Sequence, residues 1–331
     1  MNTFVITGCS GSLGRKLCSA VLAAGNRVIG IDIAAPKAQF TDECDFEFRK
    51  ADVADHLDLN AAMAGADMAI HCAALLPHKD YLGLDVYIRT NAYGARNFIL
   101  SCKENRIKKA VVISTTGVLK PNRGKTIFDS AEYRQTSNFY IKSKIEAEKL
   151  IDKLGLNKDL DYVILRPAAI YGIGMDYKWK EIFRMAENNR LFVVSSGRGL
   201  YSVICVDDFV DAILLAVQRL DKSISGEKIT ISSSDRVTIK DMLQQISIYF
   251  TAKPPKRVPF FAAYIGASLA NIAGRLVKND FLSSINPETI VDYNDGLFFD
   301  NTKASRLLGF ESRRKFQVEI MNVMDNYMEN K

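Results

Sequence analysis

Three glycines near the start of the chain, at positions 8, 11 and 14, constrain its fold more than any other feature. They follow the apolar run Phe4-Val5-Ile6, which is typical of a buried strand, and lead into a stretch from about Ser12 to Ala24 that we predict to be a helix. Because glycine has no side chain, the backbone can turn tightly here from strand to helix. A strand, a glycine turn and a helix in this order are typical of α/β proteins.

Apolar runs and helical stretches alternate through the first half of the chain. The further strands that we predict are 27–33, 46–51, 68–72, 110–114 and 162–165, and the helices between or after them are 57–64, 83–104 and 138–154. Continuous apolar strands separated by helices indicate a doubly wound parallel sheet, a Rossmann fold, buried on both faces.

The regular alternation ends after Pro167, where glycines and prolines separate shorter helices. We therefore expect a smaller mixed α/β lobe in the C-terminal half, with a substrate cleft between the lobes. The dinucleotide-binding domain is placed at 1–167 plus 201–234, and the substrate-binding lobe at 168–200 plus 235–331. With 331 residues and 48% apolar content, the chain can bury one large core or two unequal cores.

Composition excludes several classes of function. The net charge is +6, but the basic residues are scattered among acidic ones, so no nucleic-acid surface is expected. The cysteines (9, 18, 44, 72, 102 and 205) lack metal-ligand spacing, and the histidines (56, 71 and 78) are few and scattered, so we expect no metal. Cys9, Cys72 and Cys205 fall in or beside predicted strands, where cysteine usually packs as a small core residue, so we expect a reducing, cytoplasmic setting. The chain begins almost at once with a strand, so no signal peptide is expected.

The run 258–277 is the one plausible membrane candidate in the sequence. It contains Pro259, Asn271 and Arg275, and small residues that would allow close packing at positions 266, 270 and 274. Such small residues suit transmembrane helices and buried helices equally. From the length and polarity of the run we expect a helix packed on the domain and no stable membrane insertion.

The glycine turn is suited to a dinucleotide. Backbone N–H groups at a helix N-terminus attract the pyrophosphate, so we expect contacts from Gly8, Ser10, Gly11, Ser12, Leu13 and Gly14. Asp32 ends the second strand 18 residues after Gly14, where a carboxylate can accept hydrogen bonds from ribose hydroxyls and would repel a 2′-phosphate. NAD is therefore preferred over NADP. Asp52 and Val53, after the third strand, are candidate adenine contacts. The alternatives are a turn without ligand and an ordinary strand-end cap at Asp32.

Tyr140 and Lys144 are four residues apart on the helix predicted at 138–154, so they share a face. A nearby ammonium favours the phenolate form of tyrosine, which allows the phenol to exchange a proton with a hydroxyl. Thr115 follows the strand at 110–114, where ligands collect in parallel sheets, and its hydroxyl can hydrogen-bond a substrate oxygen. Ser114 and Thr116 are competing donors, and surface or capping roles are the alternatives for all of these side chains.

Together these residues resemble the extended short-chain dehydrogenase/reductase superfamily, and within it the NAD-dependent epimerase/dehydratase family. The resemblance covers nearly the whole chain and rests on TGCSGSLG (7–14), Asp32, Asp52-Val53, HCAA (71–74), Asn91, STTGV (114–118), Tyr140 and Lys144, LRPAAIYG (165–172) and VDDFVDAI (206–213). It implies Tyr140 as acid/base with Lys144 as its partner and Thr115 in the usual hydroxyl position. It also implies a homodimer through the helices that contain Asn91 and Tyr140. Further implied cofactor contacts, besides Tyr140 and Lys144, are Ala73, Ala74, Asn91 and Pro167.

Departures from the family patterns narrow the reaction. The sugar-nucleotide 4,6-dehydratases have Asp-Glu directly after the catalytic threonine, where this chain has Thr116-Gly117, so dehydration is not expected. The related decarboxylases need a glutamate at position 117, which is glycine here. The cysteine that epimerase-reductases use just past the catalytic hydroxyl is also missing. What remains is redox at a secondary alcohol: 4-epimerisation through a ketone, or net oxidation or reduction.

The substrate is less constrained. Many nucleotide-sugar enzymes have asparagine where Ala169 stands and arginine near Tyr201, although Lys178, Arg184 or Arg198 could supply charge. The run 258–277 resembles 3β-hydroxysteroid dehydrogenase relatives. By analogy with the family we favour a nucleotide-sugar 4-epimerase or 4-ketoreductase. The alternatives are a 3β-hydroxysteroid-type or other hydrophobic-alcohol dehydrogenase and a cofactor-binding regulator without turnover.

Overall fold

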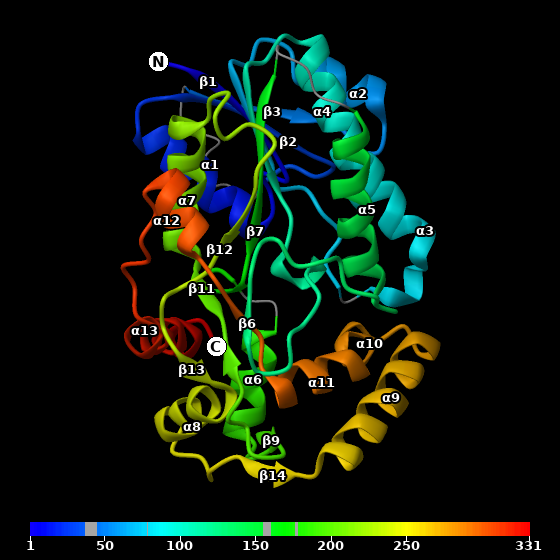
Figure 1. Cartoon of the computed structure of the whole chain (residues 1–331), viewed down its shortest axis with the longest axis vertical. Helices are drawn as coiled ribbons and strands as arrows, with labels where there is room; N and C mark the ends of the chain where they lie inside the picture. Colours follow the sequence, from blue (N-terminus) through cyan, green and yellow to red (C-terminus); the bar gives the residue numbers. More distant parts are fainter. Residues whose placement is uncertain (37–44, 78, 155–159, 176–177) are drawn as a thin grey trace.

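A seven-stranded parallel sheet forms the centre of the molecule in a computed structural model that describes residues 1–36, 45–77, 79–154, 160–175 and 178–331 (Figure 1). The strand order is β12-β7-β5-β4-β1-β2-β3, and every pairing between neighbours is parallel. The strands are β1 (Thr3–Thr7), β2 (Arg27–Asp32), β3 (Phe46–Lys50), β4 (Met68–His71), β5 (Lys109–Ile113), β7 (Asp161–Pro167) and β12 (Lys228–Ile231). The predicted doubly wound fold is confirmed.

Helices cover both faces of this sheet, because successive strand residues point to opposite sides. The helices are α1 (Ser12–Ala23), α7 (Val206–Arg219) and α12 (Thr302–Leu308) on one face, and α2 (His56–Ala62), α4 (Gly94–Glu104) and α5 (Phe139–Lys153) on the other. Ile6 packs in one core with α1, α7 and α12, whereas its neighbour Val5 packs in another with α2, α4 and α5. Figure 1 shows the two helix layers on the left and right of the strands.

The helix predicted at 83–104 is divided in the structure. A 3-10 turn, η1 (Asp80–Leu82), precedes the short α3 (Leu84–Tyr87), and a π-helical turn, η2 (Ile88–Tyr93), joins α3 to α4. π turns inside helices are rare and occur often at functional sites. Here the π turn contains Asn91, which the sequence analysis assigns to the cofactor site.

The C-terminal half builds a second lobe around an aromatic core that contains Tyr171, Trp179, Phe183 and Phe316. Its strands form two-stranded pairs: β8 (Ala169–Tyr171) with β11 (Val203–Cys205), β9 (Phe192–Val194) with β14 (Lys256–Val258), and β10 (Leu200–Tyr201) with β13 (Val237–Thr238). A further pair joins β6 (Thr126–Ile127), from the first half of the chain, to β15 (Phe298–Phe299). Its helices are α6 (Trp179–Glu187), α8 (Ile239–Tyr249), α9 (Phe260–Leu276), α10 (Asp280–Ser284), α11 (Pro287–Asp295) and α13 (Phe316–Glu329).

Two parts of the chain, the segment 201–234 and the helix α12, bear on the proposed domain limits. β12 joins the main sheet, but β11 pairs with β8 of the second lobe. α12 follows the second lobe in sequence, yet Ala304, Leu308 and the following Phe310 lie in the core with α1 and α7. The two domain ranges given above stay a proposal, and α12 belongs with the main sheet by its packing.

The run 258–277 forms the predicted helix, α9, at the lower right of the molecule (Figure 1). It contacts α10 and α11, so it is packed on the second lobe as expected. Among the described residues, no helix combines the length and apolar character that a bilayer span requires.

Candidate active site

The glycine turn between β1 and α1 forms a cradle, which a side chain at any of its glycine positions would fill. Gly8 has a φ of +76°, and a Cβ there would lie 2.7 Å from the backbone nitrogen of Ala73. At Gly14 a Cβ would lie 2.0 Å from the carbonyl oxygen of Gly8. α1 begins at Ser12, and Gly11 before it offers no side-chain cap to the first N–H groups. The cradle and these N–H groups fit a pyrophosphate.

Asp32 lies beside this turn at the end of β2. Its Oδ2 accepts a hydrogen bond from the backbone N–H of Ser10 at 3.1 Å, and its Oδ1 accepts one from Ile33 at 2.8 Å. A carboxylate has about four lone-pair sites, so acceptor capacity remains for two ribose hydroxyls. Ser10 also donates its hydroxyl to the carbonyl of Ala34 at 2.6 Å. These contacts join the glycine turn to the carboxylate, as NAD binding requires.

Asp52 and Val53 follow β3, the strand that pairs with β2. Asp52 Oδ1 accepts a hydrogen bond from the backbone of Ala54 at 2.9 Å, and its carboxylate lies 3.9 Å from Arg89. Val53 is buried, and its methyl group would lie only 2.8 Å from a Cβ at Gly94. Asp52 is thus partly exposed, whereas the side chain of Val53 packs beneath α4.

The segment after β4 lies against the cradle. Ala73 contacts Gly8, and its neighbour Ala74 is partly buried. Asn91 is buried, and its amide is bonded to both backbone groups of Leu75, at 2.7 and 3.0 Å, and to Ser143 Oγ at 2.9 Å. This amide therefore holds the segment after β4 against α5.

Pro167 ends β7, where its carbonyl accepts a hydrogen bond from the Thr116 hydroxyl at 3.2 Å. Thr116 was a competing candidate for binding the substrate oxygen, but its side chain is buried and its hydroxyl is already bonded to β7.

Thr115, Tyr140 and Lys144 meet at the carboxyl end of β5. Asn138 caps α5 by accepting a hydrogen bond from Ile141 at 3.0 Å, which starts the helix just before Tyr140. The Lys144 ammonium lies 6.0 Å from the centre of the Tyr140 ring and donates to the carbonyl of Ile113 at 2.9 Å. The Thr115 hydroxyl lies close enough to the Tyr140 phenol to lower its pKa. The structure therefore brings the three predicted side chains together.

Burial controls the proton affinities of this group. It raises the pKa of the Tyr140 phenol to about 12, against the opposing effect of the contact with Thr115. It lowers the pKa of Lys144 to about 8, against the opposing effects of Cys72 and Glu148. Before any cofactor is bound, the phenol is therefore protonated at neutral pH, and Lys144 carries its charge below about pH 8.

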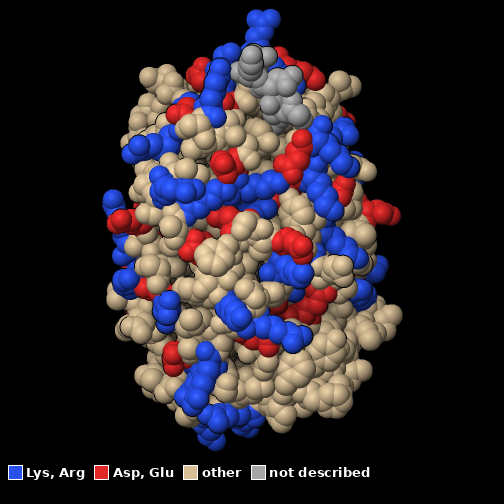
Figure 2. Space-filling model, viewed as in Figure 1, with Lys and Arg blue, Asp and Glu red and all other residues tan. Residues whose placement is uncertain are grey.

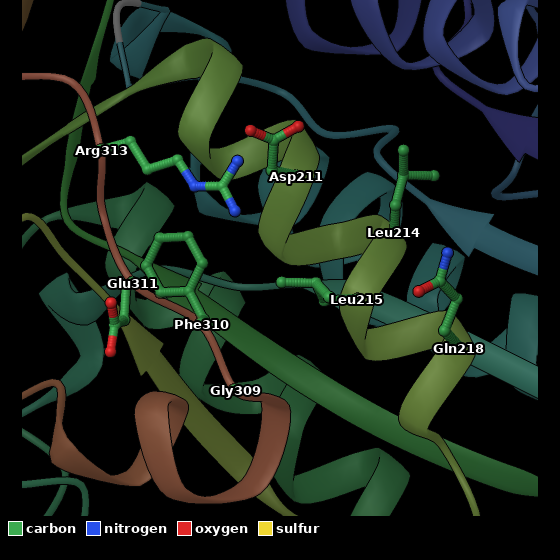
Figure 3. A pocket seen from close by; sticks show the side chains of 8 residues that line it. All are labelled: Asp211, Leu214, Leu215, Gln218, Gly309, Phe310, Glu311 and Arg313. Atoms are coloured by element: carbon green, nitrogen blue, oxygen red, sulfur yellow. The ribbon is translucent and has the colours of Figure 1, made fainter.

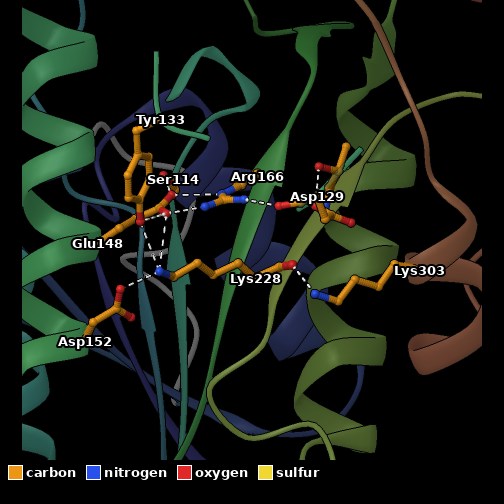
Figure 4. Close-up of polar contacts among 9 residues, drawn as sticks. Ser114, Asp129, Tyr133, Glu148, Asp152, Arg166, Lys228 and Lys303 are labelled. Carbon is orange, nitrogen blue, oxygen red and sulfur yellow. Dashed lines mark hydrogen bonds and ion pairs between the residues drawn. The ribbon is translucent and has the colours of Figure 1, made fainter. Parts of the chain in front are cut away.

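A buried ion pair supports this site and was not foreseen from the sequence (Figure 4). Glu148, one turn after Lys144, lies 2.5 Å from the guanidinium of Arg166 on β7, and both side chains are almost fully buried. The Ser114 hydroxyl donates to the same carboxylate at 2.5 Å and Tyr133 donates to it at 3.0 Å. Ser114 is thus engaged in this network, which leaves Thr115 as the hydroxyl that faces Tyr140. The spacing of four residues from Lys144 was the available signal for Glu148.

Aromatic rings and a paired arginine lie where the segment before α5 meets the second lobe. Tyr201, where the sequence departs from the nucleotide-sugar enzymes, lies edge-on to Tyr293 with ring centres 5.6 Å apart. The buried Arg134 forms a bidentate pair with Asp292 at 3.1 and 3.3 Å. Arg184, one of the residues considered above as a source of positive charge, is instead paired with Glu181 on the same helix at 2.5 Å.

The hollow in Figure 3, of about 350 Å³, lies elsewhere on the molecule. It is lined by residues of α7 and by the segment 309–313, and none of the predicted site residues lines it. The described cysteines are free, and burial raises the pKa of the Cys9 thiol to about 11. Cys44 and His78 lie outside the described residues, and within those residues no three possible metal ligands cluster.

The fold and this site define an oxidoreductase of the Rossmann type. A family model described as the NAD dependent epimerase/dehydratase family matches residues 4–232, and the chain belongs to that family. Its cofactor is accordingly NAD, and its curated relatives include dehydrogenases and reductases.

Two curated relatives and one solved structure illustrate the similarity. The chain is 26% identical to the human sterol-4-alpha-carboxylate 3-dehydrogenase, decarboxylating, over 77% of this chain and 69% of that protein. It is 28% identical to a 2-alkyl-3-oxoalkanoate reductase of Shewanella oneidensis, over 82% of this chain and 73% of that protein. A UDP-glucuronic acid 4-epimerase from Bacillus cereus, solved with UDP-glucuronic acid and NAD, has a TM-score of 0.78 and 20% identity over 99% of this chain and 100% of that one. The last comparison shows the fold.

Proposed function

We propose that this chain interconverts a secondary alcohol and a ketone on a hydrophobic substrate, with NAD as the redox partner. The observation that carries the proposal is the meeting of Thr115, Tyr140 and Lys144 at the end of β5, on the same edge of the sheet as the glycine cradle. The proposed cofactor contacts are Gly8, Ser10, Gly11, Ser12, Leu13, Gly14, Asp32, Asp52, Val53, Ala73, Ala74, Asn91, Tyr140, Lys144 and Pro167.

NAD, when bound, supplies the acceptor or donor of hydride. Tyr140, with its raised pKa, holds the proton that a ketone oxygen receives during reduction. Thr115 accepts a hydrogen bond from the backbone of Gly117 at 3.1 Å, so its own proton can be donated to the same substrate oxygen. In the oxidation direction, Tyr140 takes the hydroxyl proton, and the charge of Lys144 favours the resulting phenolate.

Lys144 has a second role in this proposal. One of its three N–H groups is donated to the carbonyl of Ile113, which fixes the ammonium beside Tyr140. The other two can be donated to the ribose next to the nicotinamide. Asn91 acts more indirectly, because its amide holds the segment that contains Ala73 and Ala74 in place.

Two observations favour a hydrophobic substrate. Tyr201 and Tyr293 place aromatic rings in the second lobe, at a position where nucleotide-sugar enzymes carry arginine, and Arg184 is already paired with Glu181. The names of the relatives agree, since a sterol carboxylate and a 2-alkyl-3-oxoalkanoate both have large apolar parts. The hydrophobic-alcohol alternative of the sequence analysis therefore becomes the first choice.

A nucleotide-sugar 4-epimerase or 4-ketoreductase, favoured from the sequence alone, becomes the second candidate. The half-buried Lys178 supports it, because this residue places a positive charge in the second lobe, near Asp292. Burial lowers the pKa of this lysine, which an anionic substrate would counteract.

Cofactor exchange separates the two candidates. An epimerase returns hydride to its own intermediate and retains NAD, whereas a dehydrogenase exchanges NAD in each turnover. We expect purified protein to exchange NAD freely and to form NADH from a 3β-hydroxysteroid or a long-chain 3-hydroxy acid. Retained NAD together with conversion of UDP-glucose to UDP-galactose would overturn the first choice in favour of the second.

The role of Tyr140 is tested by Tyr140→Phe. The variant should lose about 10²–10⁴-fold in rate because the transferred proton has no carrier. Tyr249→Phe, at a tyrosine of α8 whose hydroxyl is bonded to Asp325 in the second lobe, is the matched control and should retain the rate. Full biological activity in Tyr140→Phe would instead favour a cofactor-binding regulator without turnover.

We also propose a homodimer through the helices that contain Asn91 and Tyr140, in a reducing cytoplasmic setting. The free state of the described cysteines supports the second point. Light scattering on the purified protein should give twice the mass of one chain, and a mass of one chain would contradict the dimer.

A further inference from the structure

Helix α9 has its large apolar side chains on the outside. The five that form a stripe are spaced by four, four, three and four residues, which keeps them on one face of the helix. Their exposed fractions are 73% for Phe261, 42% for Ile265, 63% for Leu269, 57% for Ile272 and 79% for Leu276. A helix on a domain normally turns such a face inward. We call these five residues the α9 stripe.

The opposite face of α9 is buried and consists of small or polar residues. They are Ala263, Ala267, Asn271 and Gly274. Asn271 donates to the buried carbonyl of Ser283 at 2.7 Å, and a Cβ at Gly274 would lie 2.2 Å from the backbone nitrogen of Ser283. These contacts with α10 and the residues around it fix the rotation of α9. The stripe therefore faces outward because of close backbone packing on the inner side.

Positive charge lies at both ends of the stripe. Lys256 and Arg257 are exposed on β14 just before α9, and Lys278 is exposed just after it. From Lys253 to Lys278 the sequence contains five Lys or Arg residues and no Asp or Glu. Figure 2 shows a broad area without charge at the lower right, over α9, and basic side chains gathered at the bottom of the molecule, where β14 lies in Figure 1.

We propose that the α9 stripe docks this protein on an anionic phospholipid surface, with α9 lying in the plane of the interface. Apolar side chains on one face of a helix enter the boundary between headgroups and acyl chains, and lysine or arginine beside them pairs with anionic headgroups. The inference goes beyond the proposed function, since it does not depend on which substrate the site accepts.

A second copy of the chain fits this face less well. Two stripes packed antiparallel would bring Lys256 and Arg257 of one copy beside Lys278 of the other, and a parallel arrangement would bring identical cations together. With no acidic residue between positions 253 and 278, neither arrangement supplies a counter-charge from this segment. A negatively charged lipid surface supplies it directly.

α9 is joined to the helix that contains Tyr140. The guanidinium of Arg275 lies 5.0 Å from the ring centre of Phe139, the residue before Tyr140, and 3.3 Å from the buried carboxylate of Asp80. Tyr81 also donates to Asp280, at the start of α10, at 2.9 Å. A lipid-bound α9 therefore places the start of α5 close to the lipid surface.

Flotation with vesicles tests the proposal. Wild-type protein should float with vesicles of phosphatidylcholine containing about one-third phosphatidylglycerol, and less with phosphatidylcholine alone or in high salt. Phe261→Ser with Leu269→Ser should lower the bound fraction about tenfold or more, because two large apolar side chains no longer enter the lipid. Ile248→Ser with Val318→Ser is the matched control, since these side chains are 70% and 60% exposed on α8 and α13.

Charge and self-association are tested separately. Lys256→Glu with Arg257→Glu should lower binding to the anionic vesicles about tenfold, whereas Lys222→Glu with Arg306→Glu, at exposed sites away from α9, should not. Wild-type protein that stays unbound at low salt would overturn the proposal. It would also be overturned if Phe261→Ser with Leu269→Ser halved the mass of the free protein, because a second copy would then cover the stripe.

Discussion

The helices α5 and α9 are similar in length, with 15 and 17 residues, and both depart from the usual division of apolar inside and polar outside. α5 turns Ser143, Lys144 and Glu148 inward, whereas α9 turns its stripe of Phe, Ile and Leu outward. In α5 the buried charges have partners, because Glu148 meets Arg166 and Lys144 meets the carbonyl of Ile113. In α9 the stripe is exposed, and no other side chain covers it among the residues that the structure describes. Departures from simple burial rules are expected at functional sites, and here they coincide with the proposed catalytic group and the proposed docking face.

The largest effect on stability should come from the ion pair of α5. Glu148→Gln leaves the buried charge of Arg166 without its counter-ion and should lower the free energy of unfolding by about 3–5 kcal/mol. Glu132→Gln is the matched control, since Glu132 is exposed and pairs with Lys120 at 2.8 Å, and it should change stability by less than about 1 kcal/mol. Urea unfolding measures both, and equal losses would contradict the distinction.

Glu148→Gln should also change the dependence of the rate on pH. Because the charge of Glu148 raises the pKa of Lys144, its loss should move the alkaline fall in rate to lower pH. A purely structural role for Glu148 would leave the position of that fall unchanged.

Lys144→Met should lower activity but raise stability. Burial lowers the folded-state pKa of Lys144 to about 8 from 10.5, so the charged form disfavours folding below about pH 8. Between pH 8 and 10.5 the unfolded chain binds more protons, so this penalty fades as pH rises. We expect a gain of about 1–3 kcal/mol at pH 7 that shrinks by pH 10, measured by denaturant unfolding at both values. A gain independent of pH would contradict the explanation.

The smallest effects should distinguish a packed glycine of α9 from an open one. Gly274→Ala places a Cβ against the backbone of Ser283 and should lower stability by about 1–3 kcal/mol. At Gly266 no atom lies within 4 Å of an added Cβ, so Gly266→Ala should raise stability by about 0.5–1 kcal/mol through helix propensity. Thermal unfolding should show opposite shifts, and shifts of the same sign would contradict the orientation of α9.

The sequence predicts the main sheet closely, because its strands are continuous apolar runs separated by helices. The strand expected at 27–33 is Arg27–Asp32, and the helix expected at 138–154 is Phe139–Lys153. The break of the helix expected at 83–104 was missed, because nothing in local helical periodicity signals a π turn. Its position depends on Asn91 reaching Leu75 and Ser143, which are distant in sequence.

The site is predictable where chemistry and spacing coincide, as for Tyr140 with Lys144 and for the glycine turn. Glu148 was missed because a glutamate four residues from a lysine usually indicates an exposed helix pair. Its burial depends on Arg166, which lies on a distant strand. For α9 the sequence does not indicate which side of the helix is buried. Gly266 and Gly274 are both small, and only the structure shows that α10 packs against Gly274.

The side-chain amide of Asn91 forms the pair of hydrogen bonds with Leu75 that a neighbouring strand would form. It offers Leu75 the same pair of one acceptor and one donor that a neighbouring backbone would offer, beyond the point where β4 leaves the sheet. A single side chain thus provides strand-like hydrogen bonds to the segment after β4, and a change of one atom can remove one of them. In Asn91→Asp the donor becomes a second oxygen facing the Leu75 carbonyl. The segment that borders the cradle would then lose this attachment, while the hydrogen bonds between the strands of the sheet would remain.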